Sequence, residues 1–268
     1  MLPSVKYMKK FLNAFFMTIA AMTFASCANQ DDYDVYLLIG QSNMAGRGTM
    51  LAEDTLNVIE GVWLLDPDGI PEPAKAPLNK YSTIRKNLGM QQIGPGNSFA
   101  EEIHKATGRK ILLVVNARGG SALEEWMPGN TASGYFDAAV KRTRQAMQHG
   151  DLKAIIWHQG ESNSGRSETY PDSLSVFVSA LRQEFGDDDI PFVAGEVGHW
   201  TDHAEEFNSM ISHISERIPC SDYVSSEGCS MLKDESDPHF SRDGQILLGK
   251  RYAHKVLEMI SAAPSVRD

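Results

Sequence analysis

The sequence has few cysteines and few basic residues. It contains three cysteines among 268 residues, and 25 Lys and Arg against 35 Asp and Glu, for a net charge of −10. A chain of this length with 42% hydrophobic residues can bury a full hydrophobic core and does not need disulfide bonds or bound metals to stabilise it. The excess of acidic residues leaves no basic surface that would bind a polyanion, which argues against nucleic-acid binding. Composition also excludes collagen-like, coiled-coil and disordered chains.

Long apolar runs are absent as well. The most apolar stretch, Phe11–Phe24, is interrupted by Asn13 and is too short for a comfortable transmembrane helix. Residues 1–26 carry three lysines and no acid, and small residues follow the apolar stretch. This pattern predicts an export signal over 1–26, with an uncleaved N-terminal anchor as the alternative.

The segment Phe24-Ala25-Ser26-Cys27 resembles a bacterial lipobox, with Phe24 in place of the usual leucine. The resemblance implies that Cys27 is acylated and becomes the mature N-terminus, with residues 27–34 as an acidic tether. Membrane contact would then be through the lipid on Cys27 only, facing the periplasm or the cell surface. The oligomeric state stays open.

Two cysteines remain after Cys27. Cys220 and Cys229 are nine positions apart in a polar stretch. An oxidising compartment would permit a disulfide between them, and two free thiols are the alternative.

The remainder, residues 35–268, alternates apolar strands with amphipathic stretches and shows no repeat or linker. This pattern predicts one α/β domain with a parallel sheet covered by helices. A surface loop is expected over 66–77. The expected strands are 33–40, 62–65, 110–116, 154–157 and 191–196, and the expected helices are 97–106, 136–148, 172–185, 205–217 and 245–260.

Polar segments follow several of these strands and precede the last helix. They are GQSNMAG after the first strand, ARGGS after 110–116, HQGESN after 154–157, and DPHF before 245–260. Function in such a sheet is expected at the carboxyl ends of the strands. A serine after a strand and a tight glycine turn is placed as an exposed nucleophile, and a C-terminal histidine could be its base.

The blocks LIGQSNMAGRG, NARGGSALEEW, WHQGESNS and DPHFSRDGQILLGKRYA, in this order, resemble those of the SGNH hydrolase superfamily. The similarity is to carbohydrate esterase family six and the sialic-acid-specific acetylesterases. It implies a flavodoxin-like, three-layer α/β/α fold. It also implies hydrolysis of acetyl esters on carbohydrates through an acyl-serine intermediate, with no metal or other cofactor.

Site residues follow from this resemblance. Ser42 matches the nucleophile and His239 the general base. The oxyanion donors match the Ser42 N–H, the Gly120 N–H and the Gln159 side chain, with Gly119 as the alternative to Gly120.

The orienting acid departs from the superfamily pattern, which has aspartate three residues before the histidine. Position 236 is Ser236, and Asp237 lies two residues before His239. In the similar esterase family the glutamate of the HQGE block can serve, so Glu161 is the first choice and Asp237 the second. Glu161 could instead cap a helix or pair with Arg118.

Four further residues are candidates for the substrate site. Asn43 could support the turn that carries the serine, Arg118 could hold a substrate carboxylate, and Trp126 and Trp200 could stack on a sugar. A structural ion pair for the arginine and core packing for the tryptophans are the alternatives.

Two other functions are considered. His158, Glu161, Asp237 and His239 could form a metallohydrolase site, and the same fold could be a catalytically silent carbohydrate-binding lipoprotein. Without the signal, the chain has 22 basic and 35 acidic residues, a net charge of −13. This acidity favours a neutral glycan such as acetylated xylan over sialic acid.

Overall fold

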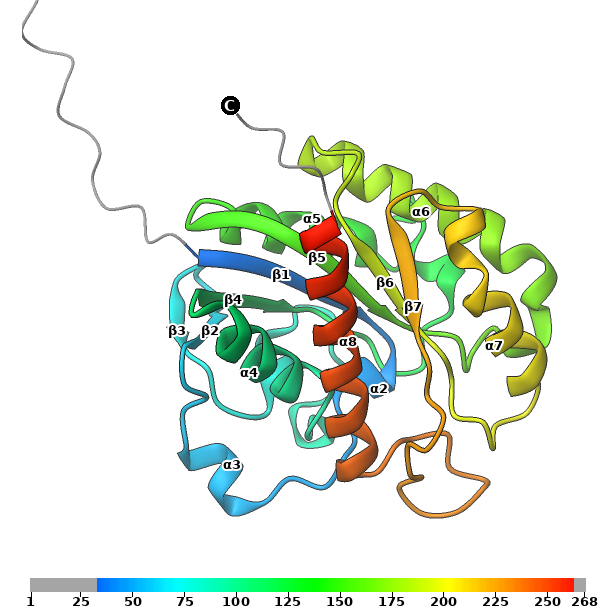
Figure 1. Ribbon diagram of the computed structural model, residues 1–268, viewed down its shortest axis with the longest axis horizontal. Helices are drawn as coiled ribbons and strands as arrows, with labels where there is room; N and C mark the ends of the chain where they lie inside the picture. The colour runs from blue at the N-terminus through cyan, green and yellow to red at the C-terminus, as the bar shows by residue number, and fades with distance from the viewer. Residues whose placement is uncertain (1–32, 263–268) are drawn as a thin grey trace, which may run out of the picture. The chain divides into compact units, whose positions relative to one another are not determined.

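The computed structural model describes residues 33–262, so the predicted signal, the lipobox Cys27 and most of the tether lie outside the described residues. The described chain has a seven-stranded sheet in the order β3-β2-β4-β1-β5-β6-β7 (Figure 1). The strands are β1 (Tyr33–Gly40), β2 (Val62–Leu65), β3 (Pro71–Pro73), β4 (Lys110–Val115), β5 (Gly150–His158), β6 (Phe192–Gly195) and β7 (Ser221–Val224). All neighbours pair in parallel except β2 and β3.

Helices connect the strands and cover both faces of the sheet. The α-helices are α2 (Ser42–Ala45), α3 (Ala52–Leu56), α4 (Gly96–Thr107), α5 (Tyr135–Ala146), α6 (Tyr170–Phe185), α7 (Ala204–Ser212) and α8 (Arg242–Ala262). Short 3₁₀ helices span Leu78–Tyr81, Leu88–Met90, Leu123–Trp126, Ser164–Thr169 and Ile214–Glu216. None of the helices in residues 33–262 has the length and apolar character needed to cross a membrane.

Strand β1 lies between the two cores. All eight of its residues are buried, because β4 and β5 flank it and helices cover both of its faces. Val35 and Leu37 face the core beneath α5, α6 and α7, and Tyr36 and Leu38 face the core beneath α4 and α8. This alternation is the two-residue period of a strand. The predicted three-layer α/β/α fold is confirmed.

The order β4-β1-β5-β6-β7 is the flavodoxin-like order, with β2 and β3 added beyond β4. After β1 the chain forms β2, β3 and β4 on one side of β1, and then crosses to form β5, β6 and β7 on the other side. The topological switch point therefore lies between β1 and β5 at the carboxyl edge of the sheet, which is where ligands bind in such folds.

Candidate active site

Ser42 lies two residues beyond the end of β1, as the first residue of α2. Gly40 permits this turn: its φ is +135°, and a Cβ there would lie 2.2 Å from the carbonyl oxygen of His158. The turn directs the serine toward the segment between β7 and α8. The structure brings Ser42 and His239 together: Nε2 of His239 lies 2.9 Å from Oγ of Ser42.

Asp237 completes this hydrogen-bonded chain. Its Oδ1 lies 2.5 Å from Nδ1 of His239 and also accepts the backbone N–H of His239 at 3.1 Å. A carboxylate against Nδ1 fixes the proton there and leaves Nε2 free to accept the serine proton. The Asx-type turn brings the carboxylate to the ring with a spacing of only two residues.

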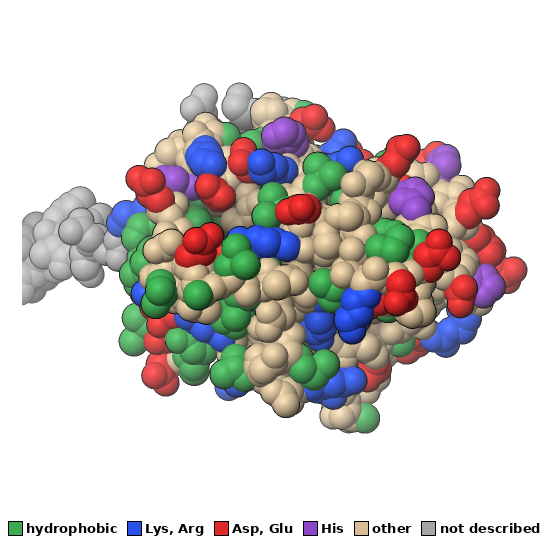
Figure 2. Space-filling view, turned by 90° about the horizontal axis from the view of Figure 1, so that it is seen from below, with side chains coloured by type: hydrophobic (Ala, Val, Ile, Leu, Met, Phe, Trp, Pro, Cys, Tyr) green, Lys and Arg blue, Asp and Glu red, His purple; other side chains and the backbone are tan. Residues whose placement is uncertain are grey.

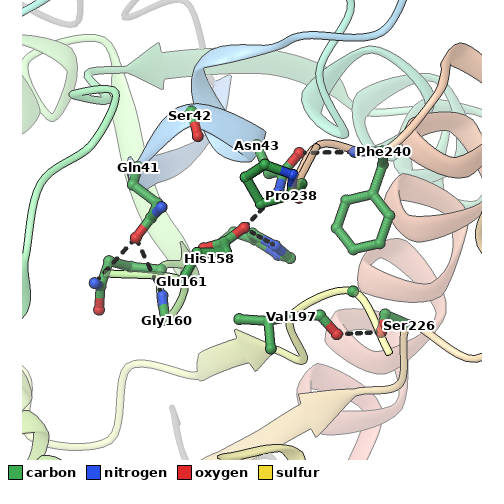
Figure 3. Close-up of polar contacts among 12 residues, drawn as sticks. Gln41, Ser42, Asn43, His158, Gly160, Glu161, Val197, Ser226, Pro238 and Phe240 are labelled. Carbon is green, nitrogen blue, oxygen red and sulfur yellow. Dashed lines mark hydrogen bonds and ion pairs between the residues drawn. The ribbon is translucent and has the colours of Figure 1, made fainter. Parts of the chain in front are cut away.

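The expectation that Glu161 contacts the histidine is wrong. Its carboxylate accepts a hydrogen bond from Nδ2 of Asn43, and its Oε1 lies 3.9 Å from Nε2 of His158 (Figure 3). Glu161 also makes no ion pair with Arg118, whose guanidinium donates to the carbonyl of Ile84. Of the two candidates, Asp237 is therefore the carboxylate placed against the ring of His239.

The pKa of His239 is lowered from its ordinary value of 6.5. Burial of the ring is the largest cause, and the charges of Arg47 and Lys233 act in the same direction, while Asp237 opposes them. The ring is therefore neutral at neutral pH and can accept a proton.

Gly119 lies beside the serine. A Cβ placed on Gly119 would lie 3.7 Å from Cβ of Ser42, whereas a Cβ on Gly120 would have only Nζ of Lys86 within contact distance, at 3.4 Å. Within residues 33–262, no hydrogen bond engages the N–H of Gly119 or Gly120. The N–H of Ser42, in the first turn of α2, has no partner within that helix. These donors are available to a negatively charged oxygen.

The Gln159 side chain does not supply a further oxyanion donor, contrary to the prediction. It is fully buried, and its Nε2 donates to Gln41, Asn163 and the carbonyl of Ser121. Its Oε1 accepts from the Tyr170 hydroxyl, which accepts in turn from the Trp157 indole. The indole can only donate, so the amide orientation is fixed and its protons are used within the protein.

The other substrate-site candidates have structural partners. Trp126 is 0% exposed, and its indole N–H donates a hydrogen bond to Oγ of Ser121. The prediction that it stacks on a sugar is therefore wrong. Trp200 is partly buried, and its indole N–H donates to the carbonyl of Asp237. Arg118 lies over the ring of Tyr135, with 5.8 Å from guanidinium to ring centroid. Asn43 is 0% exposed.

The predicted metal ligands do not converge. The described residues include no group of three His, Cys, Asp or Glu side chains that could hold a metal ion. His158 is fully buried, and its Nδ1 hydrogen-bonds the Tyr252 hydroxyl. Cys220 and Cys229 are free thiols, the first exposed and the second buried.

Two basic residues near the serine were not identified from the sequence. Nη2 of Arg47 lies 2.6 Å from the position of a Cβ on Gly119, and Nζ of Lys86 lies 3.4 Å from that on Gly120. Arg47 donates through Nη1 to the carbonyls of Gly46 and Met90. Neither cation has an ion pair with a described residue. Only the place of Arg47 within the LIGQSNMAGRG block could have pointed to it.

Known proteins share this architecture. The sequence profile described as carbohydrate esterase, sialic acid-specific acetylesterase matches residues 32–258. A probable carbohydrate esterase of Arabidopsis thaliana is 27% identical over 248 residues, covering 83% of this chain and 90% of the relative. A crystal structure of an Arabidopsis thaliana protein superposes with a TM-score of 0.74 at 23% identity, covering 85% of this chain and 98% of that one. The crystal structure of NanS gives 0.62 at 19% identity, covering 85% and 97%. The chain belongs to the sialic acid-specific acetylesterase family of carbohydrate esterases and is an esterase of the carbohydrate acetylesterase type.

Proposed function

We propose that this enzyme removes O-acetyl groups from carbohydrates through an acetyl-Ser42 intermediate. The supporting observation is the continuous hydrogen-bonded chain from Ser42 through His239 to Asp237. Such a chain activates a serine because the imidazole takes the hydroxyl proton while the carboxylate orients the ring and stabilises the imidazolium.

The reaction has two halves. In the first, Oγ of Ser42 attacks the acetyl carbonyl as its proton moves to Nε2 of His239. The tetrahedral oxyanion is held by the N–H groups of Ser42 and Gly119, and the imidazolium then protonates the departing sugar oxygen. In the second half, water gives a proton to His239 and attacks the acetyl group, and the proton returns to Ser42 as acetate leaves.

A fluorophosphonate tests this mechanism without any substitution. We expect it to phosphonylate Ser42, with a rate that falls in acid as His239 becomes protonated. Because the pKa of His239 is lowered, the midpoint of this fall is expected below 6.5. Labelling rates are measured across about pH 4 to 9, and peptide mass spectrometry locates the adduct. An adduct confined to other residues would contradict the mechanism, and a midpoint above 6.5 would contradict the lowered pKa of His239.

For the substrate, we propose a carbohydrate with an anionic group near the acetyl ester. The chain is acidic as a whole, yet Arg47 and Lys86 flank Gly119 and Gly120 without acidic partners among the described residues. Figure 2 shows Lys and Arg side chains among the acidic ones on the face viewed from below. Local charge acts on a bound ligand more strongly than distant charge, because salt screens the latter. This local charge favours an acidic sugar over the neutral glycan expected from net charge.

Replacing Lys86 with glutamine tests the charge preference. We expect kcat/KM for an O-acetylated acidic sugar to fall about two- to fivefold, because Lys86 is exposed and an exposed ion pair contributes little. Hydrolysis of acetylated xylose is expected to be unchanged. Lys250→Gln on α8 is the matched control, since it removes the same charge from another exposed position. Equal losses on the acidic and the neutral sugar would contradict the proposal.

A further inference from the structure

The amide of Asn43 joins the two segments that carry Ser42 and His239. Its Nδ2 donates to the carbonyl of Pro238 at 3.1 Å, and its Oδ1 accepts the N–H of Phe240 at 3.1 Å. These are the residues immediately before and after His239. One buried side chain, adjacent to the serine in sequence, therefore holds the backbone on both sides of the histidine (Figure 3).

Every hydrogen-bonding position of this amide is occupied. Besides its bonds to the histidine segment, Oδ1 accepts from Nε2 of Gln245 at 3.1 Å, and Nδ2 donates to the Glu161 carboxyl group. Two donors and two acceptors are the full capacity of an amide. The hydrogen bond to Glu161 keeps Nδ2 of Asn43 directed toward Glu161, so Oδ1 of Asn43 faces the N–H of Phe240.

The protonation state of Glu161 follows from the groups behind it. The Tyr252 hydroxyl donates to the carbonyl of Trp157 at 3.0 Å, so the hydroxyl can only accept from Nδ1 of His158. A neutral His158 protonated on Nδ1 has a bare Nε2, which is buried and has no partner among the described residues. This acceptor faces the Glu161 carboxyl at 3.9 Å, and Oε2 of Glu161 is also buried without a partner. A proton on the carboxyl would place a donor, rather than another bare acceptor, opposite this nitrogen.

Burial of Glu161 favours the same state below about pH 7, because it raises the pKa of this carboxyl to about 7 against hydrogen bonds from Asn43 and the backbone of Gly160 and Glu161, which favour the charged form. Burial also lowers the pKa of His158 to about 3. The other titratable groups near it are Tyr170 on α6 and Tyr252 on α8, whose pKa values are raised by burial first and by the Glu161 charge second, so both are neutral. Among these groups there is no cation to hold a carboxylate.

We propose that Asn43 is a positioning residue that holds His239 in line with Ser42, and that an uncharged Glu161 carboxyl fixes the orientation of the Asn43 amide. This inference rests on the proposed serine mechanism. It assigns Glu161 a role through Asn43, and no contact with substrate.

Four variants test the inference: Asn43→Ala, Asn43→Asp, Glu161→Ala and Glu161→Gln. Asn43→Ala and Asn43→Asp are expected to lower kcat about 10- to 100-fold with little change in KM, because a displaced histidine slows proton transfer without altering sugar binding. Asn43→Asp keeps the shape and the acceptor but removes both donors. Glu161→Ala is expected to lower kcat about tenfold or more. Glu161→Gln should restore it to within about threefold, since glutamine can accept from Asn43 and donate to His158.

The control for Asn43→Ala is Asn208→Ala. Asn208 is also buried, and its amide bonds the N–H and the carbonyl of Val197 at 2.9 and 3.0 Å. This variant should lose stability but keep kcat. Asn43 variants with the kcat of Asn208→Ala would overturn the proposal, and so would Glu161→Gln as impaired as Glu161→Ala. Ser42→Ala, assayed alongside, separates these outcomes from failure of the serine mechanism itself, which would leave that variant active.

Thermal unfolding reports the charge state directly. The pKa of Glu161 is raised in the folded protein, from 4.5 to about 7, so the folded state binds the proton more tightly than the unfolded state. The stability due to the neutral acid is present below 4.5 and is lost as pH rises through about 7. The difference in Tm between wild type and Glu161→Gln should therefore change over this window. A difference that does not vary with pH would overturn the uncharged state.

Discussion

Ser42→Ala is expected to lower kcat for an O-acetylated sugar by about 10⁴- to 10⁶-fold. The serine oxygen is the atom that forms the ester with the acetyl group, and alanine leaves no nucleophile within reach of His239. Some acceleration over the uncatalysed reaction should remain, because the N–H groups at Ser42 and Gly119 still polarise the carbonyl.

The measurement is acetate release by the wild-type enzyme and by its variants, with p-nitrophenyl acetate as a second substrate. Ser162→Ala is a suitable control, because Ser162 is an exposed serine in the loop after β5 and its hydroxyl has no hydrogen bond with a described residue. It should retain the wild-type rate. A Ser42→Ala variant that matches the Ser162→Ala rate would refute the acyl-serine mechanism.

Asp237→Asn is expected to produce the second largest loss, about 10²- to 10⁴-fold in kcat. The Asp237 carboxylate accepts from both Nδ1 and the backbone N–H of His239. Asparagine cannot stabilise the imidazolium. If its NH₂ group turns toward the ring, it also forces the proton onto Nε2, where it blocks transfer from Ser42.

Glu161→Gln is the matched comparison for Asp237→Asn. Both changes replace a carboxyl group with its amide, and both residues were candidates for the same role. Only Asp237 touches the ring, so Asp237→Asn should be the far more damaging change in kcat, with folding checked by circular dichroism. Comparable losses in the two variants would show that the geometric assignment is wrong.

The fold could be predicted where burial imposes a simple pattern. The KILLVV segment and the eight residues of β1 are covered on both faces, so they appear as apolar runs of strand length. Strands β7 and β3 were missed because both lie at the edges of the sheet. Ser221–Val224 is the edge strand and is only half buried, so its sequence is polar, and Pro71–Pro73 is a short antiparallel edge strand in the expected surface loop.

The site could be predicted down to its loops but not to all of its contacts. Topology alone brings Ser42 and His239 to one edge of the sheet. The choice between Asp237 and Glu161 depends on a local turn, in which the carboxylate folds back on the backbone two residues later. Sequence spacing does not show that turn. Gln159 and Trp126 are polar or amphipathic residues satisfied entirely inside the protein, and only coordinates reveal such partners.

The reacting pair comes from parts of the domain with very different burial. Ser42 follows a strand whose residues are all buried, whereas the segment from Glu227 to Ser236, which leads to His239, is mostly exposed. Local opening costs least where few apolar contacts are broken. The amides of residues 227–236 are therefore expected to exchange with solvent faster than those of β1, whereas His239 is held on both sides by Asn43 and stays with the nucleophile.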